Sequence, residues 1–238
     1  MLKAKREQPN PRERIFSFAH DDPADLERLL RAEWLKDKNL RRIVAFESVH
    51  SMGGNIQRVG ELCDVAHKYG ALTFCDEVHA VGLYGATGAG IGELCGIQHK
   101  IDILSGTLGK GVGGFGGYIA GRREIVDVVR QYAPGFIFTT AMPPPTCAAN
   151  IASIRILKSE QGAALRKEHW TAVALLRQEL KRHNVPFKEP ENASHVTAVQ
   201  LGSAQAADNV MKKMDAAGFH VQCKYRFIIS QHHLTRLN

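Results

Sequence analysis

The stretch Ile101-Asp102-Ile103-Leu104-Ser105-Gly106-Thr107-Leu108-Gly109-Lys110 decides how the rest of the sequence is interpreted. Its first four residues form an apolar, β-branched run that predicts a buried strand, and glycine marks where the strand ends. Lys110 then stands between two glycines, and further glycines follow at positions 113, 114, 116 and 117. Such a backbone can adopt positive φ and approach a ligand closely. A lysine at the mouth of a sheet is placed to lose its proton and attack a carbonyl, as Schiff-base lysines do.

Two other interpretations of this glycine loop are a phosphate-binding P-loop and an exposed lysine without a function. A phosphate-binding P-loop also ends in Gly-Lys, but it needs four residues between its glycines and a Ser or Thr after the lysine. Here two residues separate Gly106 from Gly109, and Gly111 follows Lys110, so the P-loop is excluded. The stretch alone also fits an exposed lysine in a flexible glycine loop.

The whole chain has the composition of a folded protein. It has 238 residues, of which 44% are hydrophobic and 23% charged, enough for one large or two modest cores and too apolar for global disorder. The net charge of +7 is spread along the chain. Because no basic run is interleaved with aromatic residues, we expect no nucleic-acid partner. The basic excess suits anionic substrates such as phosphates or coenzyme A thioesters, and it equally suits a merely basic surface.

The cysteines and the apolar runs indicate in which cellular compartment the chain resides and whether it spans a membrane. Five cysteines, at positions 63, 75, 95, 147 and 223, form no C-x-x-C pair, which indicates reduced thiols inside a cell rather than disulfides or zinc. No apolar run has the length of a membrane span, so we expect no transmembrane segment. Residues 1–14 form a basic polar segment that lacks the apolar core of a secretory signal and, with its acids and prolines, makes a poor transit peptide.

The alternation of apolar runs and amphipathic segments predicts the fold class. Strands are expected at 41–46, 71–75, 101–104 and 117–120, with an amphipathic helix at 59–69 that Gly70 ends. This order is typical of an α/β protein with a mostly parallel sheet and crossover helices. Further strands are expected at 15–20, 136–138, 195–201 and 219–222, and further helices at 22–30, 122–131, 147–157, 163–182 and 204–217.

Polar residues follow several of these strands. Ser51 comes after the strand at 41–46, Asp76 and His79 after the strand at 71–75, and Thr139 after the expected strand at 136–138. Ligands of open α/β sheets bind at the carboxyl ends of the strands. A carboxylate there can hold a protonated heteroaromatic nitrogen, an imidazole can donate to an oxygen or stack on a ring, and hydroxyl groups can bind phosphate. The residues alone also fit a helix cap, a structural histidine and ordinary turn residues.

The expected domain organisation has a large domain at 15–183 and a smaller α+β domain at 194–222. Asn, Pro and Glu cluster at 183–193 and suggest the boundary. The tail, 223–238, shows no periodicity, and its His232-His233 pair is too short and isolated to predict a metal site.

Four motifs give the chain a resemblance to a known family: Phe46–Met52, Asp76–Gly85, His99–Lys110 and Gly135–Thr140. With lysine, aspartate, histidine and threonines on strand ends in this order, the sequence resembles the α-oxoamine synthases, pyridoxal-phosphate enzymes of the aspartate-aminotransferase fold. The likeness runs from about Ile15 to Gln222. It implies a three-layer α/β large domain, mostly parallel, followed by part of a smaller α+β domain.

The resemblance also implies a role for each candidate site residue. Lys110 would hold pyridoxal 5'-phosphate covalently and, once displaced by glycine, remove its α-proton as general base. Asp76 would pair with the pyridinium nitrogen, and His79 would hydrogen-bond the phenolic oxygen of the cofactor, with Ser51 near it. Thr107 would bind the phosphate group, and Thr139 would reach the phosphate in the neighbouring subunit of a homodimer.

The motif Glu77–Gly85 is most similar to the branch that joins glycine to succinyl-coenzyme A. That reaction gives 5-aminolevulinate, coenzyme A and carbon dioxide and begins haem synthesis; the alternatives are 2-amino-3-oxobutyrate or 8-amino-7-oxononanoate synthesis, or a non-catalytic fragment. His99-Lys100 is more similar to the eukaryotic branch, which implies the mitochondrial matrix. The family chain begins upstream of Ile15 and carries a phosphate-binding turn there, and the tail from Cys223 stops matching. We therefore expect a shortened copy that is a poor catalyst alone, with no role assigned to Arg236.

Overall fold

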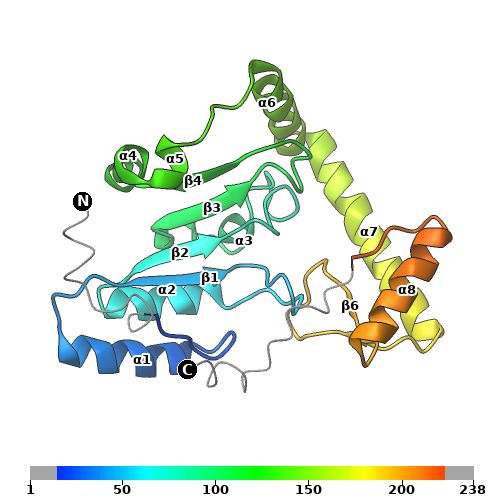
Figure 1. The fold of residues 1–238 in the computed structure, drawn as a ribbon, viewed down its shortest axis with the longest axis horizontal. Helices are drawn as coiled ribbons and strands as arrows, with labels where there is room; N and C mark the ends of the chain where they lie inside the picture. Colours follow the sequence, from blue (N-terminus) through cyan, green and yellow to red (C-terminus); the bar gives the residue numbers. More distant parts are fainter. Residues whose placement is uncertain (1–14, 223–238) are drawn as a thin grey trace. The chain divides into compact units, whose positions relative to one another are not determined.

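A computed structural model describes residues 15–222 of the chain. Its central feature is a four-stranded sheet in the order β1-β2-β3-β4 (Figure 1). Strands β1 (Ile43–Glu47), β2 (Leu72–Asp76) and β3 (Ile103–Thr107) pair in parallel, and β4 (Gly117–Gly121) pairs antiparallel with β3. The expected mostly parallel α/β sheet is therefore confirmed.

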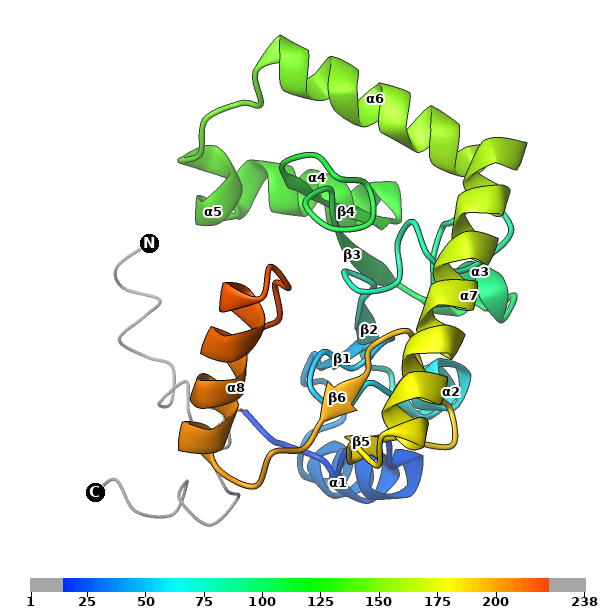
Figure 2. The same ribbon diagram turned by 90° about the vertical axis from the view of Figure 1, so that its right-hand side faces the viewer.

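Helices surround this sheet. The expected helix of 59–69 is α2 (Val59–Lys68), which packs on β2, and α1 (Pro23–Lys36) packs on α2. Figure 2, which looks along the strands, shows α2 and the short α3 (Ile91–Leu94) on the same side of the sheet. The remaining elements of this part are the 3₁₀ turn η2 (Gln98–Lys100), α4 (Arg123–Tyr132), α5 (Pro134–Ile137) and α6 (Pro144–Lys158).

Local sequence explains where these helices begin. Asp22 accepts hydrogen bonds from the amides of Ala24 and Asp25 and Pro23 occupies the first helical position, so α1 begins with a side-chain cap and a preset φ. Helix α2 has no cap of its own, and the Asp21 carboxylate accepts from the Arg58 amide at 2.7 Å instead. The chain thus joins the starts of α1 and α2 at one turn.

The core lies between the sheet and α2. Its fully buried side chains include Leu62, Cys63 and Ala66 of α2 and Cys75 of β2. Alternate residues of β1 and β2 are buried, while β4 is largely exposed. Burial of apolar area at about 25 cal/mol per Å² makes this side the main source of stability in the sheet.

Contacts divide the described chain into two units. The first comprises residues 15–50 and 56–168, and the second comprises 51–55 and 169–222. The division falls inside α7 (Glu160–Arg182). The second unit also holds the two-stranded pair β5 (Phe187–Lys188) and β6 (Ala198–Val199) and the helix α8 (Ala204–Ala216). The expectation that residues 183–193 separate a large domain from a smaller one stays a prediction.

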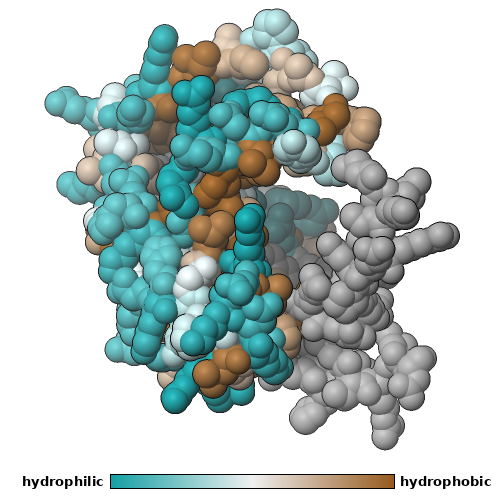
Figure 3. Space-filling view, turned by 90° about the vertical axis from the view of Figure 1, so that its left-hand side faces the viewer, coloured by the Kyte–Doolittle hydropathy of each residue, from teal (hydrophilic) through white to brown (hydrophobic). Residues whose placement is uncertain are grey.

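Three of the expected strands are wrong. Residues 15–20 and 219–222 are not in a strand, and 136–138 falls in and just after the short helix α5. Pro134 presets the first turn of α5, and the apolar residues after it are exposed, Phe136 at 54% and Phe138 at 86%. Strand preference of such residues depends on burial against a neighbour, which these positions lack here. Figure 3, viewed from the α4 and α5 side, shows apolar side chains exposed among polar ones.

Candidate active site

The carboxyl ends of β1, β2 and β3 lie at one edge of the sheet, because these strands run in parallel. The register places Asp76, the last residue of β2, directly beside Ser105 of β3. Two residues later β3 ends at Thr107, and the glycine loop begins. The edge therefore collects the polar residues that follow β2 and β3, which is where ligands of open α/β sheets bind.

The glycine loop that carries Lys110 is ordered by its own backbone. The amide of Gly114 donates to Leu108 O at 2.7 Å, the amide of Gly113 to Lys110 O at 2.8 Å, and the amide of Leu108 to Gly116 O at 2.9 Å. Leu108 and Val112 are buried, whereas Lys110 is exposed. Gly113 and Gly116 have φ of 71° and 111°, which L side chains rarely adopt. The lysine is thus presented by a fixed turn rather than by a flexible loop.

His79 lies on the turn that follows β2. The amides of Ala80 and Val81 both donate to Glu77 O, at 2.8 and 2.9 Å, and so close the turn. Lys110 Nζ lies 2.8 Å from His79 Nε2. With the ammonium as donor, His79 is the acceptor through an unprotonated Nε2. The structure therefore brings together two of the predicted site residues that stand 31 positions apart in the sequence.

Asp76 is fixed at the end of β2 by one short-range contact. Its Oδ1 accepts from the amide of Val78 at 2.8 Å. This contact resembles the helix cap that was the alternative interpretation of this residue from the sequence. The contact orients the carboxylate without neutralising it. A carboxylate held this way remains able to accept a hydrogen bond from a ring nitrogen.

Thr107 has its hydroxyl engaged within the loop. Its Oγ1 accepts from the amide of Gly109 at 3.2 Å and donates to Gly116 O at the same distance. Thr107 and the Gly109 amide thus form a small polar cluster at the end of β3. Both donors are engaged within the loop, so either one would bind an anionic oxygen by giving up its present acceptor.

The structure does not test the roles of two other predicted site residues. Ser51 groups with the second unit, so its role stays a prediction. Thr139 follows α5, which β4 leads to by running antiparallel away from the end of β3. Figure 1 shows α4 and α5 at the opposite end of the sheet from the loop that follows β3. The role of Thr139 in a neighbouring subunit stays a prediction as well.

The sequence interpretation missed Glu77, although it stands between Asp76 and His79. Its side chain is fully buried and accepts from Ser48 Oγ and from the amides of Ile91 and Gly92. Burial raises the pKa of Glu77, and the neighbouring Asp76 charge acts in the same direction. An acid immediately after a buried strand is a weak sequence signal, because most such acids are exposed.

Three of the four free thiols in the described part of the chain are poor nucleophiles. Burial raises the pKa of Cys63 to about 11 and also raises the pKa of Cys75 and Cys95. Thiolates, not thiols, act as nucleophiles, so these cysteines are inert at neutral pH. Cys223, His232, His233 and Arg236 lie outside the described residues.

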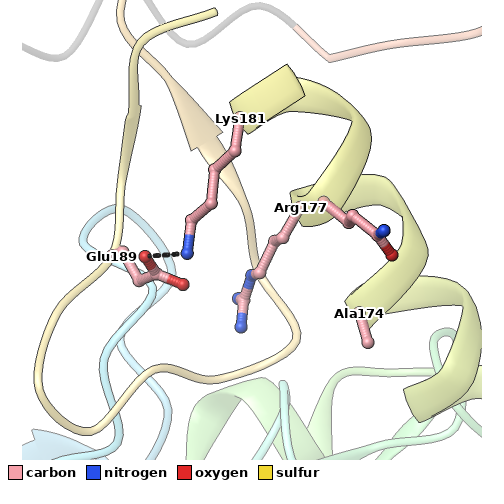
Figure 4. Close-up of a pocket in the computed structure, with 5 residues that line it drawn as sticks. Ala174, Arg177, Lys181 and Glu189 are labelled. Carbon is pink, nitrogen blue, oxygen red and sulfur yellow. Dashed lines mark ion pairs between the residues drawn. The ribbon is translucent and has the colours of Figure 1, made fainter. Parts of the chain in front are cut away.

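Neither a metal cluster nor a membrane-spanning helix is found in residues 15–222. No three His, Cys, Asp or Glu side chains there are grouped so as to hold a metal ion, and no helix there combines the length and apolarity needed to cross a membrane. A shallow hollow in the second unit is lined by Ala174, Arg177, Gln178, Lys181 and Glu189 (Figure 4). Lys181 pairs with Glu189 at 2.7 Å, and Arg177 donates to Ser194 O, Val196 O and Thr197 Oγ1, so both cations hold the chain leading into β6.

Known proteins share this sequence and architecture. The family model described as aminotransferase class I and II matches residues 14–236. The erythroid-specific, mitochondrial 5-aminolevulinate synthase of Mus musculus is 54% identical over 189 residues, which cover 79% of this chain and 31% of that protein. The chain therefore spans about a third of the length of the curated relatives it matches.

Solved structures agree with the sequence relatives. A serine palmitoyltransferase structure from S. paucimobilis superposes with a TM-score of 0.79 at 29% identity, covering 86% of this chain and 52% of that one. An 8-amino-7-oxononanoate synthase from Francisella tularensis has a TM-score of 0.64 at 20% identity, covering 82% of this chain and 56% of that one. The second likeness shows a shared fold and no more.

Proposed function

Because this chain belongs to the aminotransferase class I and II family, we propose that it carries the catalytic centre of a 5-aminolevulinate synthase. The reaction condenses glycine with succinyl-coenzyme A and releases coenzyme A and carbon dioxide, and the cofactor is pyridoxal 5'-phosphate. The observation that carries the proposal is the contact of Lys110 with His79 at the sheet edge where Asp76 ends β2. The sequence relatives, which are 5-aminolevulinate synthases, and the pyridoxal phosphate bound in the serine palmitoyltransferase structure support it.

The residues present fit the cofactor chemically. An amine, an imidazole, a carboxylate and a hydroxyl beside an amide meet at one edge, and these match its aldehyde, phenolic oxygen, ring nitrogen and phosphate. When bound, pyridoxal phosphate withdraws electrons from the α-carbon of an amino acid. Lys110 supplies the nucleophilic nitrogen that holds the cofactor, and its exposed position on a fixed turn lets the amine reach a small substrate.

Lys110 also acts as the base toward glycine. Its Nζ takes the proton from the α-carbon, which requires the neutral amine. His79 Nε2 accepts a hydrogen bond from this nitrogen and thereby fixes its direction. The Asp76 carboxylate would pair with the ring nitrogen of the cofactor and favour the protonated ring. Thr107 and the Gly109 amide would turn toward the phosphate group of the cofactor and would give up the contacts that Thr107 Oγ1 now makes within the loop.

The remaining roles concern partners and location. Ser51 would serve the phenolic oxygen of the cofactor, and Thr139 would complete the site of a second copy, which would make the protein a homodimer. The exposed position of Thr139 after α5 supports a role across a subunit interface rather than in its own site. The mitochondrial names of the relatives support the mitochondrial matrix as its place of action.

The proposal is tested with the full chain, saturating pyridoxal phosphate and glycine deuterated at the α-carbon. We expect solvent exchange of the α-deuteron, and aminolevulinate formation with succinyl-coenzyme A ahead of acetyl- and pimeloyl-coenzyme A. Lys110→Ala is the matched control. Exchange with preference for another thioester would replace the proposed substrate by that of a different α-oxoamine synthase. Absence of both exchange and product would identify a non-catalytic chain and overturn the proposal.

A further inference from the structure

Glu77 is a buried carboxylate that the proposed chemistry does not use. Its side chain has 0% exposure. Three donors converge on it: Ser48 Oγ at 2.5 Å, the amide of Gly92 at 2.8 Å and the amide of Ile91 at 3.1 Å. Two side-chain oxygens at this position provide the acceptor sites for all three, whereas a side-chain amide would offer one oxygen and turn an NH₂ group toward the donors.

These donors belong to segments that are distant in the sequence. Ser48 follows β1, whereas Ile91 and Gly92 begin α3 at the far end of the loop that starts with His79. Gly90, with φ of 115°, lies so close that a Cβ on it would approach Glu77 Cδ to 2.8 Å. The Glu77 carboxylate therefore connects the start of α3, where the loop ends, to the end of β2, where the loop begins.

The same loop packs against the lysine turn. A Cβ on Gly111 would collide with the carbonyl oxygen of Val81, and one on Gly82 would meet Gly111 C at 3.0 Å. The amide of Gly82 donates to Gly88 O at 2.8 Å and closes the loop on itself. The backbone next to His79 thus lies directly on the backbone next to Lys110, and a shift of either one moves the other.

Packing alone does not account for an acid at this position. Burying a carboxylate among apolar groups costs free energy unless hydrogen bonds offset it. The neighbouring Asp76 adds a like charge that opposes ionisation. An apolar side chain would fill the same space without that cost, but it would leave three buried donors unpaired and the loop path unspecified.

We propose that Glu77 is a positioning residue that fixes the distance between His79 and Lys110 by clamping the loop of residues 78–92. The catalytic importance of the distance between His79 and Lys110 rests on the proposed function. The clamping of the loop by Glu77 can be measured without cofactor. Glu77 touches neither reacting atoms nor cofactor in this assignment. It acts through the loop backbone.

The first measurement is amide hydrogen exchange of the cofactor-free chain, comparing the parent with Glu77→Gln. The glutamine turns an NH₂ group toward amide donors, so we expect about tenfold faster exchange at Ile91 and Gly92. The proposal further requires faster exchange at Gly113 and Gly114, whose amides close the lysine turn. Exchange that rises at residues 91–92 alone, with the lysine turn unchanged, would overturn it.

Glu93→Gln is the matched control. Glu93 accepts from the amides of Thr87 and Ala89 at the tip of the same loop. We expect this variant to loosen residues 87–89 and to disturb Gly113 and Gly114 less than Glu77→Gln does, because the loop tip reaches the lysine turn indirectly, through the contact of Gly88 with Gly82. Equal effects of the two variants on amide exchange in the lysine turn would contradict the proposal, because Glu77 would then only stabilise the loop in general. If Glu77→Gln does not fold, Ser48→Ala removes one donor and is expected to give the same pattern, smaller in size.

The second measurement is the rate at which Lys110 captures pyridoxal phosphate, trapped with borohydride and quantified by peptide mapping. We expect Glu77→Gln to slow capture at Lys110 by about tenfold, and Glu93→Gln to match the parent. Capture at the parental rate in Glu77→Gln would overturn the positioning role. Failure of the parent itself to capture would contradict the proposed function, while the exchange experiment still decides whether Glu77 holds the lysine turn.

Discussion

Nζ of Lys110 lies 2.8 Å from Nε2 of His79, although one residue belongs to the turn after β2 and the other to the loop after β3. The parallel pairing of β2 with β3 brings both turns to the same edge of the sheet. The contact gives the amine a defined direction before any ligand is present.

Lys110 is expected to be the residue that pyridoxal phosphate modifies. After borohydride reduction and digestion, the phosphopyridoxyl group should map to the peptide containing Lys110. Lys100, which pairs with Asp64 at 2.8 Å, serves as the internal control and should remain unlabelled. A label on Lys100 or any other lysine, with Lys110 unmodified, would show the assignment to be wrong.

His79→Ala is expected to slow capture of pyridoxal phosphate by Lys110 about tenfold, the effect of losing one directing hydrogen bond. The rate is measured by the appearance of the borohydride-stable label. His67→Ala is the matched control, because His67 Nε2 also makes a short hydrogen bond, to Asp102 at 2.9 Å, away from the lysine turn. Equal rates for parent and His79→Ala would contradict a role for this contact.

Asp76→Asn is expected to leave folding intact and to slow α-proton loss from glycine by about a hundredfold or more, because a neutral amide no longer favours the protonated ring. The asparagine Oδ1 can still accept from the Val78 amide. Folding is checked by thermal unfolding and proton loss by deuterium exchange into glycine. Deuterium exchange into glycine at the parental rate would contradict a role of Asp76 toward the ring nitrogen and leave it only the contact with the Val78 amide.

Asp102 is expected to make stability depend on pH. Burial raises the pKa of its carboxyl, but hydrogen bonds from Thr73 and His67 outweigh this, and the net pKa is lowered. A lowered pKa stabilises the fold above the unfolded value of about 4, and that stability is lost as pH falls through the folded pKa.

Asp102→Asn should therefore reduce the free energy of unfolding by about 1–3 kcal/mol at pH 7. The difference between parent and variant, measured by urea unfolding, should shrink as the pH is lowered below about 4. Asp64→Asn, which changes an exposed ion pair, should have little effect at either pH. A difference for Asp102→Asn that stays constant from pH 7 to pH 3 would contradict the assignment.

Periodicity was sufficient where an element has its own strong pattern. The helix expected at 59–69 and the strand expected at 71–75 are α2 and β2, shifted by one residue at most at each end. It was insufficient where burial decides the conformation. Phe136-Ile137-Phe138 has strand-like composition, but Pro134 begins a helical turn there and no neighbouring strand covers these side chains.

The sequence by itself determined the parallel α/β architecture, the position of Lys110 after a buried strand, and the likeness of its motifs to the α-oxoamine synthases. These follow from local apolar periodicity and from residue types at strand ends. Only the tertiary structure decided that His79 contacts Lys110, that Thr139 lies away from them, and that Glu77 clamps the loop between β2 and α3. Such contacts depend on strand register and on the loop path. Both are set by glycines at positive φ and by buried hydrogen bonds between segments far apart in the chain.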